Sequence, residues 1–518
     1  MTSISDKDWD VIVIGTGMGG GTIGRRLAEL GKSVLFLERG PNGIRAEEHE
    51  LRADVHDKQA RLVRGFLPEP MHATVDGVET VFYAPLGCGV GGSSVFYAAT
   101  LERPEPHDLD ACPEIPHPTG GWPVSYAEMR PYFEEAERLF HVCGNADPLG
   151  DPVDLPTGAQ TTAVDAYLTE TMRKGGLHPY QGHLALQHLD ACTYCLGSKC
   201  PRDCKMDGRS AGVEPALATG RAQLFDLCEV RSLNSEHGKI TSIDVYYQGH
   251  SISLKARAYV LSAGALCSPR LLMASGDLAN GSGQVGRNLM FHLSEIFALW
   301  PGLKHKGSAP SKALAFRDLY HDGATRFGMV QAMGIQARYG EIVHYLNMRF
   351  DRSRLRHIAP LRQLTRLVAA IATQLLGEAK IFVGILEDLP DSENRVLYDQ
   401  KQPEKLAITY NISRELQSRR KVFRQKIKQS INRLRPIFLG RGPDINYGHP
   451  CGTLRFGNDP TSSVLNRDCR AHQLENLWVV DASFMPTSMG VNPSLTIAAN
   501  ALRVGDVLAE TLEQDSAL

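Results

Sequence analysis

The chain has 518 residues, of which 42% are hydrophobic and 22% charged, as in an ordinary globular protein. This length exceeds a single hydrophobic core, so we expect two large, interleaved domains. The net charge of −2 provides no overall basic field for nucleic acid or an anionic membrane, and no run of about 18 apolar residues could span a bilayer. Residues 1–10 lack a signal-peptide pattern, so we expect a cytoplasmic protein, with export on a partner subunit's signal as the alternative.

A dinucleotide-binding pattern opens the chain. Residues 10–15 form an apolar, β-branched run typical of a buried parallel strand. The G-x-G-x-x-G glycines that follow are Gly15, Gly17 and Gly20. They permit a tight turn, close approach of a pyrophosphate, and a helix starting near Met18 whose dipole favours phosphate. A second strand, 33–38, ends in Glu38, which is placed to accept ribose hydroxyls. This motif alone does not separate NAD from FAD.

A second glycine-rich loop occupies residues 85–94. Gly91 and Gly92 would let the backbone approach a planar ring or a pyrophosphate, and Ser93 adds a hydroxyl group. Taken alone, the segment could equally be a flexible surface loop.

Four cysteines lie within thirteen residues. They are Cys192, Cys195, Cys200 and Cys204. Closely spaced cysteines in a reducing compartment are more often metal ligands or redox groups than disulfide partners. Their spacing differs from the common ferredoxin run and is compact for zinc, which needs four ligands. An iron–sulfur cluster, zinc, disulfides in an exported protein, and unmetallated thiols all remain open.

The middle of the chain returns to the nucleotide domain and then becomes basic. Residues 227–233 and 240–247 read as a hairpin pair, and 258–265 as a strand followed by a helix from Ser268. Further on, residues 352–372 combine arginines with apolar side chains. We expect a solvated helix that packs its leucines inward; an amphipathic helix that contacts a membrane or a partner is the alternative.

The last part of the chain holds a second polar constellation. A buried strand at 477–483 contains Asp481, which could hold a ribityl hydroxyl. A turn ending in Asn492 and Pro493 leads into a helix whose dipole would support negative charge on a flavin. Upstream, His449 lies in a polar, glycine-bounded segment, although a solitary histidine is usually structural.

In this order, the motifs resemble the glucose–methanol–choline family of FAD-dependent oxidoreductases. The resemblance spans the chain; its motifs are Gly15-x-Gly17-x-x-Gly20, Gly91-Gly92-Ser93-Ser94, Ser262-Ala-Gly-Ala-x-x-Ser-Pro269, His449-x-x-Gly-Thr and Asn492-Pro-x-Leu-Thr. It implies a mixed α/β fold: a Rossmann-like FAD-binding domain interleaved with a substrate domain on an antiparallel sheet with covering helices. We expect mainly FAD-binding residues at 1–300, with a cysteine-rich insertion near 190–210, a substrate domain at 301–445, and a return with active-site residues at 446–518.

The resemblance also assigns roles to residues. His449 matches the family's catalytic histidine and Asn492 its partner, which together bind a substrate hydroxyl over the flavin. The implied FAD-binding residues are Gly15, Gly17, Met18, Gly20, Glu38, Gly91, Gly92, Ser93, Val230, Asp481, Asn492 and Pro493. Relatives carry an Asn or a FAD-linking His in the stretch that reads Val95-Phe-Tyr-Ala-Ala-Thr100 here, so we expect non-covalent FAD.

The same stretch is more similar to the catalytic subunits of bacterial sugar and gluconate dehydrogenases. Those subunits bind a three-iron cluster through a C-x4-C-x3-C pattern, which Cys195, Cys200 and Cys204 reproduce, with Cys192 a further possible ligand. The resemblance implies oxidation of a CH–OH group in a sugar, polyol or other alcohol. Electrons would pass through the cluster to a quinone, a cytochrome or a small subunit. An oxidase using O2 is the enzymatic alternative, and a non-catalytic flavin electron carrier the alternative from another class.

Overall fold

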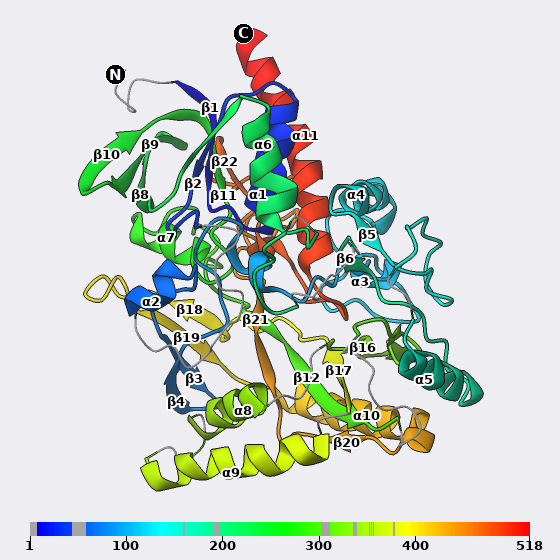
Figure 1. Cartoon of the computed structure of the whole chain (residues 1–518). Helices are drawn as coiled ribbons and strands as arrows, with labels where there is room; N and C mark the ends of the chain where they lie inside the picture. Colours follow the sequence, from blue (N-terminus) through cyan, green and yellow to red (C-terminus); the bar gives the residue numbers. More distant parts are fainter. Residues whose placement is uncertain are drawn as a thin grey trace.

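The computed structural model describes residues 8–43, 58–158, 161–187, 189, 196–202, 204–301, 311–334, 339–351, 353, 355, 357–376 and 379–517. Two sheet regions lie one above the other in Figure 1. The upper region is a parallel sheet with helices, and the lower one is an antiparallel sheet covered by helices. The expected mixed α/β fold is confirmed.

The upper sheet has five parallel strands in the order β22-β11-β1-β2-β7. Their bounds are β1 Trp9–Ile14, β2 Val34–Leu37, β7 Ala222–Phe225, β11 Ala256–Leu261 and β22 Leu477–Val479. The strands come from both halves of the chain, so the nucleotide domain is assembled from distant segments. Central residues such as Val11 and Val260 are fully buried, as the apolar runs predict.

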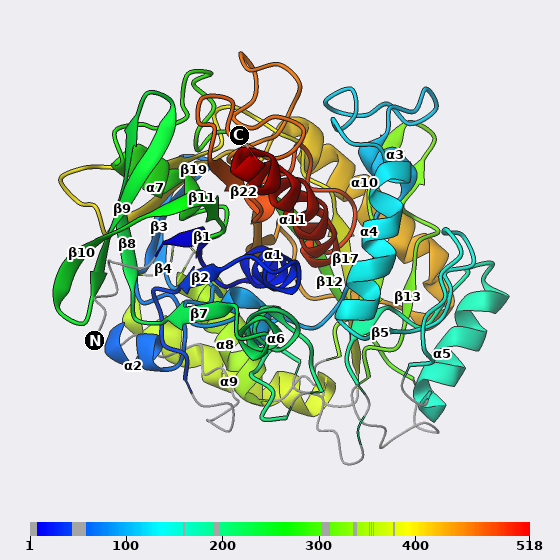
Figure 2. The ribbon, with the colours of Figure 1, turned by 90° about the horizontal axis from the view of Figure 1, so that it is seen from above.

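Two helices pack side by side on this sheet, as Figures 1 and 2 show: α1 (Met18–Glu29) and α11 (Ser494–Ala517). Arg26 of α1 donates to Asp506 of α11 over 2.6 Å. A Cβ on Gly24 would lie 2.1 Å from the buried ring of Phe36 on β2. Glycine therefore brings α1 close enough to the sheet for its N-terminus to reach the strand ends.

The lower sheet is antiparallel, in the order β13-β16-β17-β12-β20, and β21 also pairs with β12. Its strands are β12 Met290–Leu299, β13 Ala315–Phe316, β16 Val330–Ala332, β17 Lys380–Leu386, β20 Ile437–Phe438 and β21 Ile445–Cys451. Helix α10 (Arg414–Ser430) packs on it through Phe423 and Ile427, which crowd Gly384 of β17. Arg420 and Arg424 of α10 also pair with the buried Glu295 of β12.

A third, four-stranded sheet joins early and late parts of the chain, in the order β18-β19-β3-β4. Its strands are β3 Met71–Val75, β4 Val78–Phe82, β18 Arg395–Leu397 and β19 Leu406–Tyr410. Here β3 pairs in parallel with β19, although more than 300 residues separate them. The chain thus crosses between the two regions repeatedly, and the boundaries at 300 and 445 stay predictions.

The remaining elements complete both regions. The helices are α2 Lys58–Val63, α3 Pro106–Leu109, α4 Tyr126–Leu139, α5 Ala163–Lys174, α6 Glu214–Ala218, α7 Ser268–Ala274, α8 Tyr339–Asp351 and α9 Ala359–Leu376, and the strands are β5 Val142–Cys143, β6 Leu184–Ala185, β8 Glu229–Glu236, β9 Lys239–Tyr247, β10 His250–Leu254, β14 His321–Asp322 and β15 Thr325–Arg326. Within the part of the chain that the structure describes, no helix has both the length and the apolarity needed to cross a membrane.

Candidate active site

The first glycine loop joins β1 to α1. Gly15 has a φ of +94°, and a Cβ on it would lie 2.3 Å from the Ser262 carbonyl oxygen, so only glycine fits there. By contrast, nothing lies within 4 Å of the position that a Cβ on Gly17 would take. No side chain caps the start of α1 at Met18. This helix terminus therefore has room and uncapped amides for an anion, which fits the phosphates of a dinucleotide.

Glu38 ends β2 beside this loop and is almost fully buried. Its carboxylate accepts hydrogen bonds from the Thr16 hydroxyl at 2.6 Å and from the Gly40 amide at 3.0 Å. Burial raises the pKa of Glu38, and these hydrogen bonds oppose that rise. Val230 is close by in sequence to Cys228, whose amide donates to the Glu38 carbonyl at 2.9 Å. The predicted ribose acceptor Glu38 is thus hydrogen-bonded to the segment that leads into β8, which contains Val230, a further predicted FAD-binding residue.

The second glycine loop folds against the first. The Gly91 amide donates to the Thr16 hydroxyl at 3.2 Å, so one threonine connects this loop to Glu38. A Cβ on Gly92 would lie 3.0 Å from the Gly17 Cα atom. Ser93 accepts from the Gly87 amide at 2.9 Å, which fixes the loop internally. The structure therefore brings the two predicted cofactor loops together.

Asp481 follows β22 and is buried. Its two oxygens accept from the Gly264 amide at 2.9 Å, from the Ser268 hydroxyl, and from the amide and hydroxyl of Ser483, the amide at 2.9 Å. Four donors fill the acceptor sites of one carboxylate. In this arrangement Asp481 joins the C-terminal strand to the start of α7, so ribityl binding by Asp481 stays a prediction.

His449 lies in a bulge of β21. Between the pairs Met290–Cys451 and His292–Asn446, four residues of β21 face only Phe291 of β12. A bulge bends the strand and redirects side chains, and Pro450 within it cannot donate to the ladder. The bulge, and not the regular alternation of a β-strand, therefore sets the direction of the His449 side chain, the predicted catalytic histidine.

A second histidine, His292 of β12, contacts His449 directly. The two Nδ1 atoms are 3.0 Å apart, and the rings meet edge to face at 86°. His292 Nε2 lies 3.0 Å from the carbonyl oxygen of Met489, which only accepts, so Nε2 carries a proton. In a neutral His292 the Nδ1 atom is then an acceptor, so His449 Nδ1–H donates to it. The Nε2 atom of His449 is left unprotonated and available as a base.

A second side chain, that of Asn446, also lies close to His449 Nδ1. Asn446 Nδ2 lies 3.2 Å from His449 Nδ1, while Asn446 Oδ1 accepts from the Gly448 amide at 3.1 Å. In the deduced tautomer the Asn446 amide packs beside the imidazole without donating to it. The shorter contact, to His292, sets the proton position.

Burial keeps both imidazoles neutral. Desolvation lowers the pKa of His292 to about 4. Desolvation also lowers the pKa of His449 well below 6.5; the neighbouring His292 ring, which would repel a second cation, and the Lys312 ammonium lower it further. The His449 side chain keeps some solvent exposure, but protein atoms surround its ring closely enough for desolvation to dominate. A neutral histidine is the form that can accept a proton.

Lys312 is the nearest cation acting on this histidine. It is buried, and its ammonium group donates to the Ala98 carbonyl at 2.8 Å, in the stretch that follows the second glycine loop. Burial lowers the pKa of Lys312 to about 7; Glu102 raises it and Lys205 lowers it. Lys312 therefore carries positive charge mainly below neutral pH, where it acts on His449.

Asn492 lies at the end of the turn that precedes α11, beside the buried Pro493. Its side-chain oxygen accepts from Gln331 Nε2 of β16 at 3.1 Å, which leaves its amide nitrogen to donate. The same turn contains Met489, the hydrogen-bond partner of His292. His449 contacts His292, and His292 is hydrogen-bonded to the turn that carries Asn492, so the two predicted site residues are connected through this network.

Three of these residues have no sequence signal. His292 lies on β12, which also carries Ser294 and Glu295, Gln331 is the polar residue of the short strand β16, and Lys312 lies in a segment without a motif. Pairing of β12 with β21 brings His292 to His449, whereas Gln331 reaches Asn492 from β16 and Lys312 comes from the segment before β13.

The cysteine run is only partly described. Cys192 and Cys195 lie outside the described residues, whereas Cys200 and Cys204 are buried with their sulfur atoms 3.3 Å apart. Cys200 also lines a narrow cavity with Gly89 and Val90 of the second glycine loop. Among the described residues, no group of three or more His, Cys, Asp or Glu side chains could hold a metal ion.

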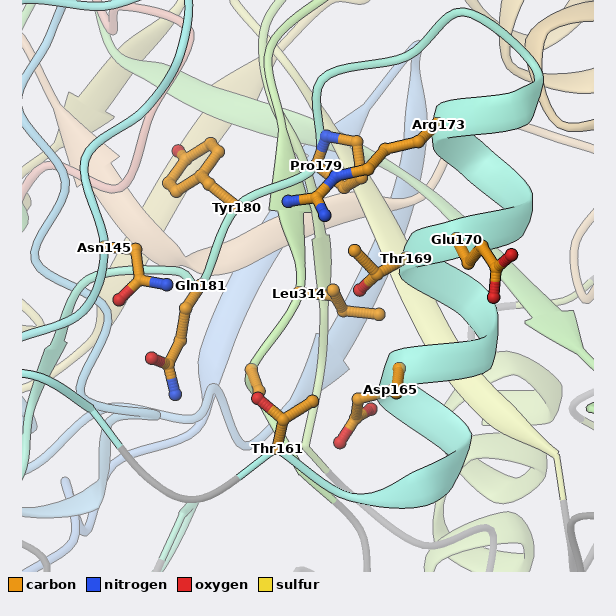
Figure 3. A pocket seen from close by; sticks show the side chains of 12 residues that line it. Asn145, Thr161, Asp165, Thr169, Glu170, Arg173, Pro179, Tyr180, Gln181 and Leu314 are labelled. Atoms are coloured by element: carbon orange, nitrogen blue, oxygen red, sulfur yellow. The ribbon is translucent and has the colours of Figure 1, made fainter.

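A cavity of about 330 Å³ lies elsewhere, against α5 (Figure 3). Asp165, Thr169 and Arg173 of α5 face Tyr180 and Gln181 across it. Neither His449 nor Asn492 lines this cavity, so we do not assign the reaction to it.

Comparison with known proteins agrees with this geometry. Two family models described as GMC oxidoreductase match residues 10–294 and 342–501. The 6'''-hydroxyparomomycin C oxidase of Streptomyces lividus is 27% identical, covering 99% of this chain and 93% of its own. The 2-methyl-1,2-propanediol dehydrogenase of Mycolicibacterium austroafricanum is also 27% identical, over 98% and 96%. The fructose dehydrogenase large subunit of Gluconobacter japonicus is 24% identical, over 98% of each chain.

Among solved structures, the pyridoxine 4-oxidase from Mesorbium loti matches with a TM-score of 0.63 and 19% identity, covering 96% of this chain and 99% of its own. That likeness bears on the fold alone. The family matches cover most of the chain and include every motif of the predicted site. The chain therefore belongs to the glucose–methanol–choline (GMC) family of FAD-dependent oxidoreductases.

Proposed function

We propose that this protein is a dehydrogenase that oxidises a CH–OH group of a sugar, polyol or other alcohol. The observation that carries the proposal is the contact of 3.0 Å between His449 Nδ1 and His292 Nδ1, from which we infer that the Nδ1 proton of His449 is shared with His292 and that Nε2 accepts a proton. FAD, when bound, supplies the hydride acceptor. A pure electron carrier needs neither a buried base nor its amide partner.

Two side chains of the protein act on the substrate hydroxyl. His449 Nε2 takes the hydroxyl proton, and Asn492, held by Gln331, orients the oxygen through its amide nitrogen. The uncapped start of α1, Glu38 and the second glycine loop would hold the dinucleotide without a covalent bond. The chain's own residues thus contribute two effects: Asn492 positions the substrate oxygen, and His449 provides a neutral base.

We further propose that Cys195, Cys200 and Cys204 hold an iron–sulfur cluster of the three-iron type. Their spacing supports this, as do the burial and convergence of the Cys200 and Cys204 sulfurs and the position of Cys200 beside the second glycine loop. Such a cluster would supply one-electron transfer toward a quinone, a cytochrome or a small subunit. Similarity to a protein named a large subunit supports a partner of this kind.

An oxidase is the competing function, favoured by the equal similarity to a relative named an oxidase. The same base and amide would serve it, because proton removal from the alcohol is common to both reactions. The two differ in the electron acceptor, so iron content and oxygen use separate them.

The first prediction concerns the base. In an anaerobic panel of sugars, polyols and alcohols, at least one compound should bleach the flavin absorption band of the parent protein. With that compound, His449→Ala should slow flavin reduction by about 10²–10⁴-fold, because it deletes the general base. Asn492→Ala should cost less, and His250→Ala on the exposed edge of β10 should change nothing. Parent-rate reduction by the His449 variant would remove His449 from the mechanism.

The second prediction concerns pH. The reaction needs neutral His449, so its rate falls as pH drops through the pKa of His449, which lies well below 6.5. Lys312 is charged in that range, since burial sets its pKa at about 7. Lys312→Gln removes the charge and should raise the pKa of His449, moving the acid limb of flavin reduction to higher pH.

Lys380→Gln is the matched control for that experiment, because Lys380 is also buried but pairs with Leu299 at the far end of β12 from His292. Stopped-flow reduction between pH 5 and 9, roughly the range that histidine and this lysine span, measures both variants. An unmoved acid limb in Lys312→Gln would show that the Lys312 charge does not act on His449.

The third prediction concerns the cysteines. Protein purified anaerobically from a host that assembles clusters should contain iron and acid-labile sulfide with its FAD, and show an electron paramagnetic resonance signal. Cys200→Ser should lose the iron while keeping the FAD, since the residues predicted to hold the ribose and phosphates are others. Stoichiometric FAD without iron would contradict the cluster, and rapid oxygen consumption in that protein would establish the oxidase.

A further inference from the structure

Asp388 lies at the end of the lower sheet, next to the two histidines. The ladder between β12 and β17 stops at the pair Leu293–Leu386, and two residues further on the Asp388 carboxylate accepts from the Phe291 amide over 3.0 Å. A side chain therefore replaces the backbone carbonyl that a longer ladder would have supplied. Because Phe291 directly precedes His292, this bond holds the backbone that carries the His292 imidazole.

The backbone of Asp388 holds the other side of the same imidazole. Its amide donates to the Ser488 hydroxyl at 2.8 Å, and its carbonyl accepts from that hydroxyl at 3.0 Å. Ser488 directly precedes Met489, whose carbonyl oxygen lies 3.0 Å from His292 Nε2. One residue thus connects the strand that carries the donor imidazole to the turn that carries its acceptor.

Three donors converge on the Asp388 carboxyl. Besides the Phe291 amide, the Tyr410 hydroxyl donates to Oδ2 at 2.6 Å and the Leu389 amide donates to Oδ1 at 2.8 Å. Asp388 is almost fully buried, and burial raises its pKa to about 7, while these hydrogen bonds oppose the rise. A buried carboxylate costs stability, so folding alone does not account for an acid at this position.

We propose that Asp388 is a positioning residue of the active site, which holds His292 against the Met489 carbonyl and so keeps the proton of His292 on Nε2. His292 Nδ1 then stays an acceptor for His449, whose Nε2 remains the base. This role rests on the proposed function of His449. Asp388 acts through the backbone on both sides of one hydrogen bond, and a misplacement of about 1 Å in an active site can cost about 10²-fold in rate.

Variants of Asp388 and Ser488 in the complete, FAD-loaded protein test this role. Asp388→Ala removes the acceptor for Phe291 and should slow the limiting rate of flavin reduction by about 10–100-fold with little change in the half-saturating substrate concentration, because it disturbs the base and not the substrate contacts. Asp388→Asn keeps one side-chain oxygen to accept from Phe291 and Tyr410, so it should recover most of that rate. Ser488→Ala breaks the connection to the turn and should act like Asp388→Ala, and it carries the test if Asp388→Ala does not fold.

Asn394→Ala is the matched control. Asn394 is buried in the same segment as Asp388, and its side chain bonds to the backbone of Asn411 at 2.7 and 3.2 Å. Its loss removes a similar pair of buried hydrogen bonds but leaves the contacts of Asp388 in place. This variant should reduce its flavin at the parent rate, which would separate positioning from a general loss of stability.

Nuclear magnetic resonance of ¹⁵N-labelled histidine gives a readout that needs neither substrate nor a working base. At about pH 8, above the pKa of Asp388, His292 should carry its proton on Nε2 in the parent and in Asn394→Ala, and should show both tautomers in Asp388→Ala and Ser488→Ala. A His292 that keeps its proton on Nε2 in the folded variants would overturn the role of Asp388, whatever their rates. Parent-rate reduction by His449→Ala would instead overturn the proposed function and leave the His292 readout valid, so the two failures are distinguishable.

Discussion

The contact between His292 and His449 is the interaction on which the rest of the site depends. One imidazole comes from the regular strand β12 and the other from the bulge of β21, so strand pairing sets their separation. The Met489 carbonyl fixes the proton of His292, and this in turn fixes the proton of His449. Because Met489 belongs to the turn that ends at Asn492, these hydrogen bonds connect His449, the predicted base, to the turn that carries its predicted partner.

Burial determines the protonation state of the two histidines in this hydrogen-bonded network. In water either nitrogen of a histidine could carry the proton, and near neutral pH both often would. Here desolvation disfavours the cation on both rings, and Lys312 opposes it further on His449. In the predicted cofactor site, Thr16 connects the second glycine loop at Gly91 to Glu38, the predicted ribose acceptor. Few groups serve each role, so single substitutions should have separable effects.

The sequence predicts best where the determinants are local. The turn at Gly15 and the acid at Glu38 are fixed by backbone geometry within one βαβ unit, and the structure has them there. His292 could not be predicted, because pairing between β12 and β21, which are distant in sequence, brings it to His449, and Lys312 lies before β13 in a segment without a motif. Periodicity found α9 but could not tell which face α8 would cover. The expectation that this helix packs its leucines inward is wrong for Leu364 and Leu367, which are 51% and 59% exposed.

The proton on His449 Nδ1 is the most direct consequence of this account. Nuclear magnetic resonance of the protein with ¹⁵N-labelled histidine, assigned by comparison with His449→Ala and His292→Ala, reports the protonation of each ring nitrogen. At pH 6 we predict a neutral His449 with its proton on Nδ1, and a neutral His292 with its proton on Nε2. A His449 that is cationic at this pH, or neutral with its proton on Nε2, would contradict the assignment of Nε2 as the catalytic base.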